Sequence, residues 1–262
     1  MYRPALLVAA ALALAGCGGP ATAGESDRLS VVAAFYPLAY AVEQVGGDRV
    51  TVASLTKPGG EPHDLELLPR QVVQLREADV VVYLRDFQPV VDAAVTAHAS
   101  DRAFDVAPSA RLLELEAETG APADDHGHEE HDGHDHGSVD PHFWLDPTRY
   151  ADVARAVAAE LSAKDPAGTT AYAANAARFT GELASLDAEF SAGLAQCGNR
   201  EFVTGHRAFG YLADRYDLVE ESVSGLTPEQ EPTARGMAQV VDFVRQQGIT
   251  TVYAEAQANP AL

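Results

Sequence analysis

The sequence predicts an α/β protein of two lobes, each a parallel sheet with covering helices, joined by one long rigid helix. Short apolar runs rich in β-branched residues alternate with helical patterns, as in a parallel sheet whose strands are connected through helices. A much longer helical pattern, from Thr169 to about Gln196, lies midway along the chain. The alternation of strand and helix resumes after it, which predicts a second lobe.

The first residues are typical of a secretion signal. Arg3 precedes the apolar run Ala5 to Ala15, which is too short to be a comfortable membrane-spanning helix. Leu14-Ala-Gly-Cys17 is similar to a bacterial lipobox, so we expect a signal peptide over 1–16 and a lipid-modified Cys17. Residues 17–28, rich in Gly, Ala and Ser, then form a lipidated tether that holds the folded part off the membrane. A signal anchor is the alternative.

The first lobe is expected over 29–165. Its predicted strands are 29–35, 50–55, 79–84 and 102–106, and its predicted helices are 37–46, 69–78, 89–99 and 150–161. Ligands of open parallel sheets bind beyond the carboxyl ends of the strands. The Gly- and Pro-rich loop 58–64, which carries His63, follows the second strand at such an end. His98, on the helix 89–99, is interpreted as an ordinary surface residue.

The linking helix is expected over 166–197, after Asp165-Pro166 breaks the preceding helix. Its apolar residues recur at spacings of four and three, which one helix face can bury. They are Tyr172, Ala176, Phe179, Leu183, Leu186 and Phe190. An ordinary core helix would show the same pattern, but its length and position favour a strut between the lobes.

The second lobe is expected over 198–262, with a strand that runs into a turn over 201–206, further strands at 218–223 and 250–254, and helices at 209–216 and 233–247. His206 ends the turn after the first of these strands and so repeats the placement of His63. The sequence stops at Asn259-Pro-Ala-Leu262 before a parallel lobe would close. We therefore expect this lobe to be truncated.

The first lobe also includes a histidine-rich acidic loop over 124–136, which contains no apolar residue that could anchor it in a core. Its histidines are His126, His128, His131, His134 and His136. Imidazole is the commonest metal ligand, so we predict an auxiliary metal loop, against the alternative of a merely solvating tract. Just beyond it, prolines and aromatic residues in Asp140-Pro-His-Phe-Trp-Leu-Asp-Pro147 hold His142 in place.

The formal net charge of −21 excludes nucleic acid as a natural partner and favours a cation. After removal of the signal and modification of Cys17, Cys197 is the one thiol left in the sequence. No internal disulfide can then form. We expect Cys197 to be either buried and inert or paired with a cysteine further along.

Together these motifs resemble the metal-binding receptor lipoproteins of bacterial ABC importers for zinc and manganese. The resemblance rests on the lipobox, Glu61-Pro-His-Asp-Leu-Glu66, the histidine loop, the motif around His142, Thr204-Gly-His-Arg-Ala-Phe-Gly210 and Glu255-Ala-Gln257. It implies the metal-receptor solute-binding protein fold, with His63, His142 and His206 as ligands in the cleft between the lobes. The family commonly supplies a carboxylate as fourth ligand, at a place that falls beyond residue 262. Glu61 or water could serve instead, and Glu255 is interpreted as structural.

Three neutral imidazoles and one oxygen suit Zn²⁺ as the transported ligand, whereas manganese sites usually replace an imidazole with a carboxylate. The sequence thus predicts a high-affinity extracytoplasmic zinc receptor, monomeric and lipid-anchored, that delivers the ion to an ABC transporter permease. A manganese receptor or a metal-binding surface adhesin of the same fold are the alternatives. A secreted zinc hydrolase is less favoured, because His128-Glu-Glu-His131 lacks the His-Glu-x-x-His spacing and Gly-x-Ser-x-Gly is missing.

Overall fold

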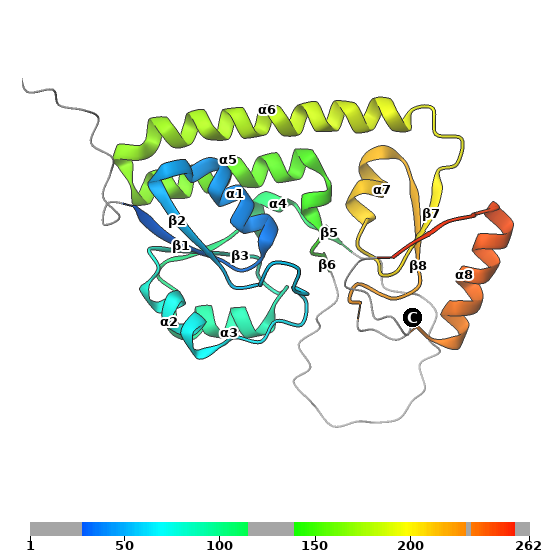
Figure 1. Cartoon of the computed structure of the whole chain (residues 1–262), viewed down its shortest axis with the longest axis horizontal. Coiled ribbons are helices and arrows are strands. Elements are labelled where there is room, and N and C mark those ends of the chain that lie inside the picture. Colours follow the sequence, from blue (N-terminus) through cyan, green and yellow to red (C-terminus); the bar gives the residue numbers. More distant parts are fainter. Residues whose placement is uncertain (1–27, 115–138, 229–231, 255–262) are drawn as a thin grey trace, which may run out of the picture.

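The computed structural model describes residues 28–114, 139–228 and 232–254. Within them two parallel sheets with helices on both sides lie next to each other, and one long helix runs along both (Figure 1). The predicted two-lobed α/β fold is confirmed. The signal peptide, Cys17, the histidine loop 124–136 and Glu255 lie outside the described residues. In the described part, no helix combines the length and the apolarity needed to cross a membrane.

The first sheet has the strand order β2-β1-β3-β4, and every neighbouring pair is parallel. Its strands are β1 (Leu29–Ala33), β2 (Val50–Ser54), β3 (Val80–Tyr83) and β4 (Ala103–Asp105). The helices α1 (Tyr36–Gly46) and α5 (Pro147–Lys164) cover one face, and α2 (Pro69–Glu77) and α3 (Pro89–His98) cover the other (Figure 1). All four residues of β3 are buried, as expected for a central strand covered on both faces.

Proline and capping residues determine where the helices of this lobe begin. Helices α1, α2, α3 and α5 each have a proline in the first turn, where the missing N–H costs no helical hydrogen bond. The carboxylate of Asp146 also caps α5 by accepting from the backbone N–H groups of Thr148 and Arg149. This cap and Pro147 set the start of α5 five residues after His142.

A short antiparallel pair between the lobes was not predicted. It joins β5 (Leu113–Glu114) to β6 (Val139–Asp140), with Leu113 opposite Asp140. The helix α4 (Ala107–Ala110) precedes it, and 3-10 turns lie at Phe143–Leu145 and Pro166–Gly168. His142 thus follows a strand of this antiparallel pair and not a strand of either parallel sheet. Elements of two to four residues are too short to produce a periodic pattern.

The long helix α6 spans Thr169–Leu194 and contacts both lobes. Tyr172, Ala176, Phe179 and Leu183 are buried as predicted. The prediction that the buried seam continues is wrong, because Leu186 and Phe190 are 41% and 38% exposed. That second half lies over α7 (Gly210–Tyr216), where contacts are fewer: the Phe190 ring stacks on Tyr216, and Arg215 pairs with Asp187.

The second sheet is parallel in the order β8-β7-β9, with β7 (Glu201–Thr204), β8 (Val219–Ser222) and β9 (Val252–Tyr253). Helices α7 and α8 (Ala234–Gln247) lie on opposite sides of it (Figure 1). The hydroxyl of Thr233 caps α8 by accepting from the backbone N–H of Gly236. Cys197 is exposed, so of its two expected states the buried one is wrong, and pairing with a cysteine further along stays a prediction.

Candidate metal centre

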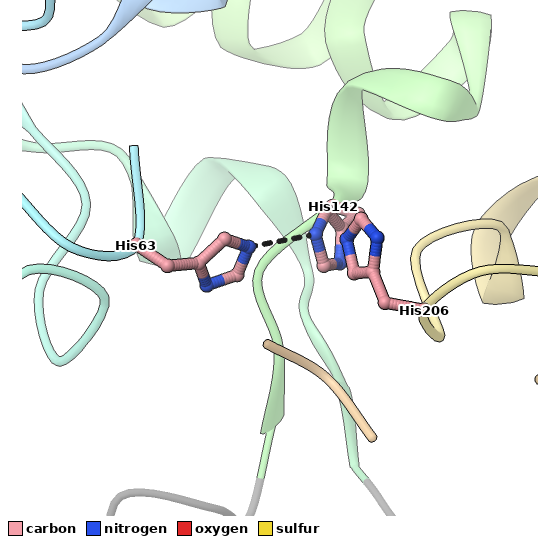
Figure 2. A group of neighbouring side chains, drawn as sticks. All are labelled: His63, His142 and His206. Atoms are coloured by element: carbon pink, nitrogen blue, oxygen red, sulfur yellow. Dashed lines mark hydrogen bonds between the residues drawn. The ribbon is translucent and has the colours of Figure 1, made fainter. Parts of the chain in front are cut away.

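His63, His142 and His206 converge where the two lobes meet, although they come from three separate parts of the chain (Figure 2). One ring nitrogen of each lies within 4.8 Å of the others. His142 and His206 are buried, and the side chain of His63 is only 7% exposed. Among the described residues this is the one group of three or more potential metal ligands that lie so close together.

His63 is held by contacts on both sides of its own peptide unit. The Glu61 carboxylate accepts a hydrogen bond from the backbone N–H of His63 at 3.0 Å. The buried Gln88 side chain donates to the carbonyl of Pro62 at 2.7 Å. The ring of Phe87 packs edge-on against the His63 ring, with centroids 4.8 Å apart. The loop is therefore fixed although it has no regular secondary structure.

His142 is oriented by Asp140, which lies two residues before it at the end of β6. The Asp140 Oδ1 atom lies 2.7 Å from Nδ1 of His142 and also accepts from its backbone N–H at 2.9 Å. Because a carboxylate accepts from the Nδ1–H group, the lone pair of Nε2 is left for a ligand, an arrangement common behind metal-bound imidazoles. The Trp144 ring packs against the His142 ring at 5.4 Å.

His206 lies in the turn between β7 and α7. This turn is closed by a bond from the backbone N–H of Ala208 to the carbonyl of His206 and by one from Arg207 to Gly225. The ring centroid of His206 lies 5.9 Å from that of His63 and 5.5 Å from that of His142. The second lobe thus presents its imidazole to the two from the first lobe and the β5–β6 pair.

The spacing of one pair of ring nitrogen atoms fits a tetrahedral ion. Nε2 of His63 and Nε2 of His142 are 3.2 Å apart (Figure 2). Two imidazole nitrogens bound to a tetrahedral Zn²⁺ at about 2.0–2.1 Å would be about 3.3–3.4 Å apart. The arrangement can therefore accept such an ion with little movement of either ring.

Electrostatics keeps His63 in the neutral form that a metal requires. Burial, followed by the nearby His142 and His206 rings, lowers its pKa from 6.5 to about 3. Protonation would place a cation in an apolar wall that includes Phe87, beside two further imidazoles. A divalent cation can instead be shared by all three rings.

Glu61 does not belong to the group of atoms within 4.8 Å, although its Oε1 lies 4.0 Å from Nε2 of His63. His98 is exposed on α3, as predicted. Sequence reasoning quoted Asp140 as part of a motif without giving it a role, and it missed Gln88. The spacing Asp-x-His is a signal that could have identified Asp140, whereas Gln88 reaches Pro62 only through the fold.

Comparison with known proteins gives one family and several similar proteins. Residues 31–262 match the family described as "ZnuA: Zinc-uptake complex component A periplasmic". The chain is 34% identical over 266 residues to "Zinc-binding lipoprotein AdcA" of Streptococcus pneumoniae (strain ATCC BAA-255 / R6), covering 100% of this chain and 52% of that protein. It is also 29% identical to "High-affinity zinc uptake system protein ZnuA" of Bacillus subtilis (strain 168), covering 97% of this chain and 80% of the relative.

Among solved structures, the crystal structure of Zn(II)-bound AdcA from Streptococcus pneumoniae is similar, with a TM-score of 0.71 and 30% identity. The similarity covers 90% of this chain and 48% of that one. This chain thus spans about half the length of AdcA and most of the length of the Bacillus subtilis relative.

Proposed function

This chain belongs to the zinc-uptake complex component A family, and from that premise we propose that it is a high-affinity extracytoplasmic receptor that delivers Zn²⁺ to the permease of an ABC importer. Zinc is the cargo of this receptor, held by His63, His142 and His206. We infer binding rather than catalysis, because the family is one of uptake components.

The observation that carries the proposal is the convergence of three buried or nearly buried imidazoles from separate segments, with two Nε2 atoms 3.2 Å apart. Neutral imidazole is a borderline ligand that suits zinc. A fourth ligand is needed to complete a tetrahedron, and water or the Glu61 carboxylate is proposed for that position. Glu61 would have to approach from its present place beside His63.

Zinc is favoured over manganese because manganese prefers oxygen ligands and the cluster offers three nitrogens. Isothermal titration of the metal-free chain with Zn²⁺, followed by competition with Mn²⁺, tests this. We expect one tight zinc per molecule that excess manganese does not displace. Stronger retention of manganese than of zinc would contradict the proposal. The His98→Ala variant is the matched control, because His98 is an exposed imidazole on α3 that does not belong to the three-histidine group.

Lipid anchoring through Cys17 and a monomeric state complete the proposal. The lipobox-like sequence and the name of the lipoprotein relative support the anchor. Expression in a bacterial host should place the chain in the membrane fraction, and Cys17→Ala should move it out of that fraction. Equal membrane association of both forms would contradict lipidation. Light scattering of the purified chain should give the mass of one copy.

The histidine loop 124–136 is proposed to capture zinc more weakly than the three-histidine site. The proposal is supported by the loop's place in the chain: the segment that contains it begins after β5 and ends before β6, and the last residue of β6, Asp140, is two residues before His142. Deleting residues 124–136 should remove weak zinc sites, keep one tight site and reduce zinc uptake only when zinc is scarce. Loss of the tight site on deletion would contradict this division.

A further inference from the structure

Glu220 is a partly buried carboxylate beneath the turn that carries His206. It lies on β8 opposite Phe202 of β7, so its backbone belongs to the second sheet. One of its oxygens accepts a hydrogen bond from the Thr204 hydroxyl at 2.7 Å. The backbone N–H of Phe209 donates to both carboxylate oxygens, at 3.2 and 3.1 Å. A single side chain therefore contacts both ends of the segment 204–209.

This segment connects β7 to α7, and His206 lies inside it. The Thr204 hydroxyl is also 2.9 Å from the carbonyl of His206, so the residue held by Glu220 contacts the histidine backbone directly. A turn fixed at its two ends has fewer conformations available, which lowers the entropy lost when its histidine binds an ion. Outer contacts of this kind orient metal ligands and influence affinity.

We propose that Glu220 is a positioning residue that holds the 204–209 turn so that His206 faces His63 and His142. The proposal rests on the zinc-binding function proposed above. Its physical content is geometric: the two bonds to Thr204 and Phe209 matter, and the negative charge does not. Glutamine can accept from the Phe209 N–H and exchange a hydrogen bond with the Thr204 hydroxyl, so it should replace the glutamate.

Three variants of the full chain test the role: Glu220→Ala, Glu220→Gln and Glu221→Ala. Glu221 is the control, because it is the next residue on β8 and carries the same charge, and both carboxylates interact electrostatically with Arg207. Zinc affinity is measured by competition with a chelator. The absorption spectrum of the Co²⁺-loaded chain reports the coordination geometry, and thermal melting of the metal-free chain reports stability.

We expect Glu220→Ala to weaken zinc binding by about 10-fold to 100-fold, the usual effect of losing an outer-shell contact, and to change the Co²⁺ spectrum. Glu220→Gln should stay within about threefold of the parent in affinity, less than 1 kcal/mol by the usual conversion, and keep its spectrum. Glu221→Ala should match the parent. If Glu220→Ala does not fold, Thr204→Val replaces it: it removes one of the two anchors and should weaken binding and alter the spectrum in the same direction.

Parental affinity and spectrum in folded Glu220→Ala, with only a lower melting temperature, would overturn the inference, as would unchanged binding in Thr204→Val. Equal losses in Glu220→Gln and Glu220→Ala, or a similar loss in Glu221→Ala, would assign the effect to charge and also overturn it. If the parent chain binds no zinc, the receptor proposal fails and this inference fails with it. If the parent binds zinc tightly and the variants do not behave as expected, only the Glu220 inference fails.

Discussion

The two lobes supply ligands to the same cluster from very different surroundings. In the first lobe, β3 is buried along its whole length under helices on both faces. In the second lobe, the turn that carries His206 is held by hydrogen bonds to Glu220 and to the carbonyl of Gly225. An apolar core therefore supports the first lobe, whereas hydrogen bonds carry much of the order around His206.

The difference indicates two ways of preorganising a metal ligand. His63 is wedged against Phe87, and its loop is pinned by the buried Gln88. His206 depends instead on a turn closed by bonds between backbone groups and polar side chains. A packed core is stabilised by many contacts that are each weak, so it tolerates the loss of one. A hydrogen-bonded turn is stabilised by a few bonds that each contribute more. Single substitutions should consequently affect the second type of support more sharply.

The largest expected effect comes from His142→Ala. His142 lies between His63 of the first lobe and His206 of the second, and its loss removes one of the three zinc ligands. Zinc affinity should fall by more than about 100-fold, beyond the usual range for outer-shell changes. Titration calorimetry against the His98→Ala control measures it. If this variant kept the tight site, the cluster would not be the zinc site.

The next largest effect is expected for Asp140→Asn, which removes the negative charge of the side chain and keeps its size and shape. The buried Asp140 carboxylate holds the His142 ring through Nδ1, and an amide oxygen is a weaker acceptor. Zinc affinity should fall by about 10-fold to 100-fold. Asp152→Asn is the control, since Asp152 pairs with Arg111 and Arg155 on the surface of α5. Equal affinities in both variants would argue against the orienting role.

A smaller effect is expected where the lobes are joined, at the fully buried Tyr211 of α7. Its hydroxyl donates to the carbonyl of Asp140 at 2.6 Å and accepts from the N–H of Leu113 at 2.8 Å. Tyr211→Phe should cost about 1–3 kcal/mol, because the buried Asp140 carbonyl and the partly buried Leu113 N–H lose their partner, and zinc should dissociate faster. Denaturant unfolding and stopped-flow release measure these, with the exposed Tyr253→Phe as control. Identical behaviour of the two variants would show that this connection is unimportant.

The last expected effect concerns the stability of the zinc-free chain and its dependence on pH, and it does not involve zinc affinity. The pKa of His63 is about 3 when folded and near 6.5 when unfolded, so the unfolded chain binds more protons between these values. Stability contributed by the neutral His63 should be present above pH 6.5 and lost as the pH falls from about 6.5 toward 3. Urea midpoints at pH 7.5 and 4.5, compared with His63→Gln, should show a smaller decline in the variant. Equal declines would contradict the assigned pKa.

Most of the fold could be predicted from the sequence because apolar runs and helical periodicity persist over many residues. The prolines at 37, 69 and 89 mark the first turns of three helices, whereas α5 begins at Pro147, before the predicted start at residue 150. The β5–β6 pair could not be predicted, since strands of two residues contain no period. The predicted buried face of α6 was too long, because the spacing of apolar residues does not show where the core packed against a helix ends.

The candidate site was predictable at its histidines and much less so around them. His63, His142 and His206 stand in recognisable motifs, and the structure brings them together. Gln88 and Glu220 act across 26 and 11 to 16 residues of sequence, on Pro62 and on the turn of His206. Such contacts depend on the packing of whole elements, which local sequence patterns do not specify.

The central claim is that one zinc ion binds to all three histidines at the junction of the lobes. A crystal structure of the zinc-loaded chain with anomalous data at the zinc edge tests it most directly. We predict one strong anomalous peak at the cluster, about 2.0–2.1 Å from Nε2 of His63, Nε2 of His142 and a ring nitrogen of His206. A zinc ion bound by fewer than three of these imidazoles, or a main peak elsewhere on the chain, would contradict it.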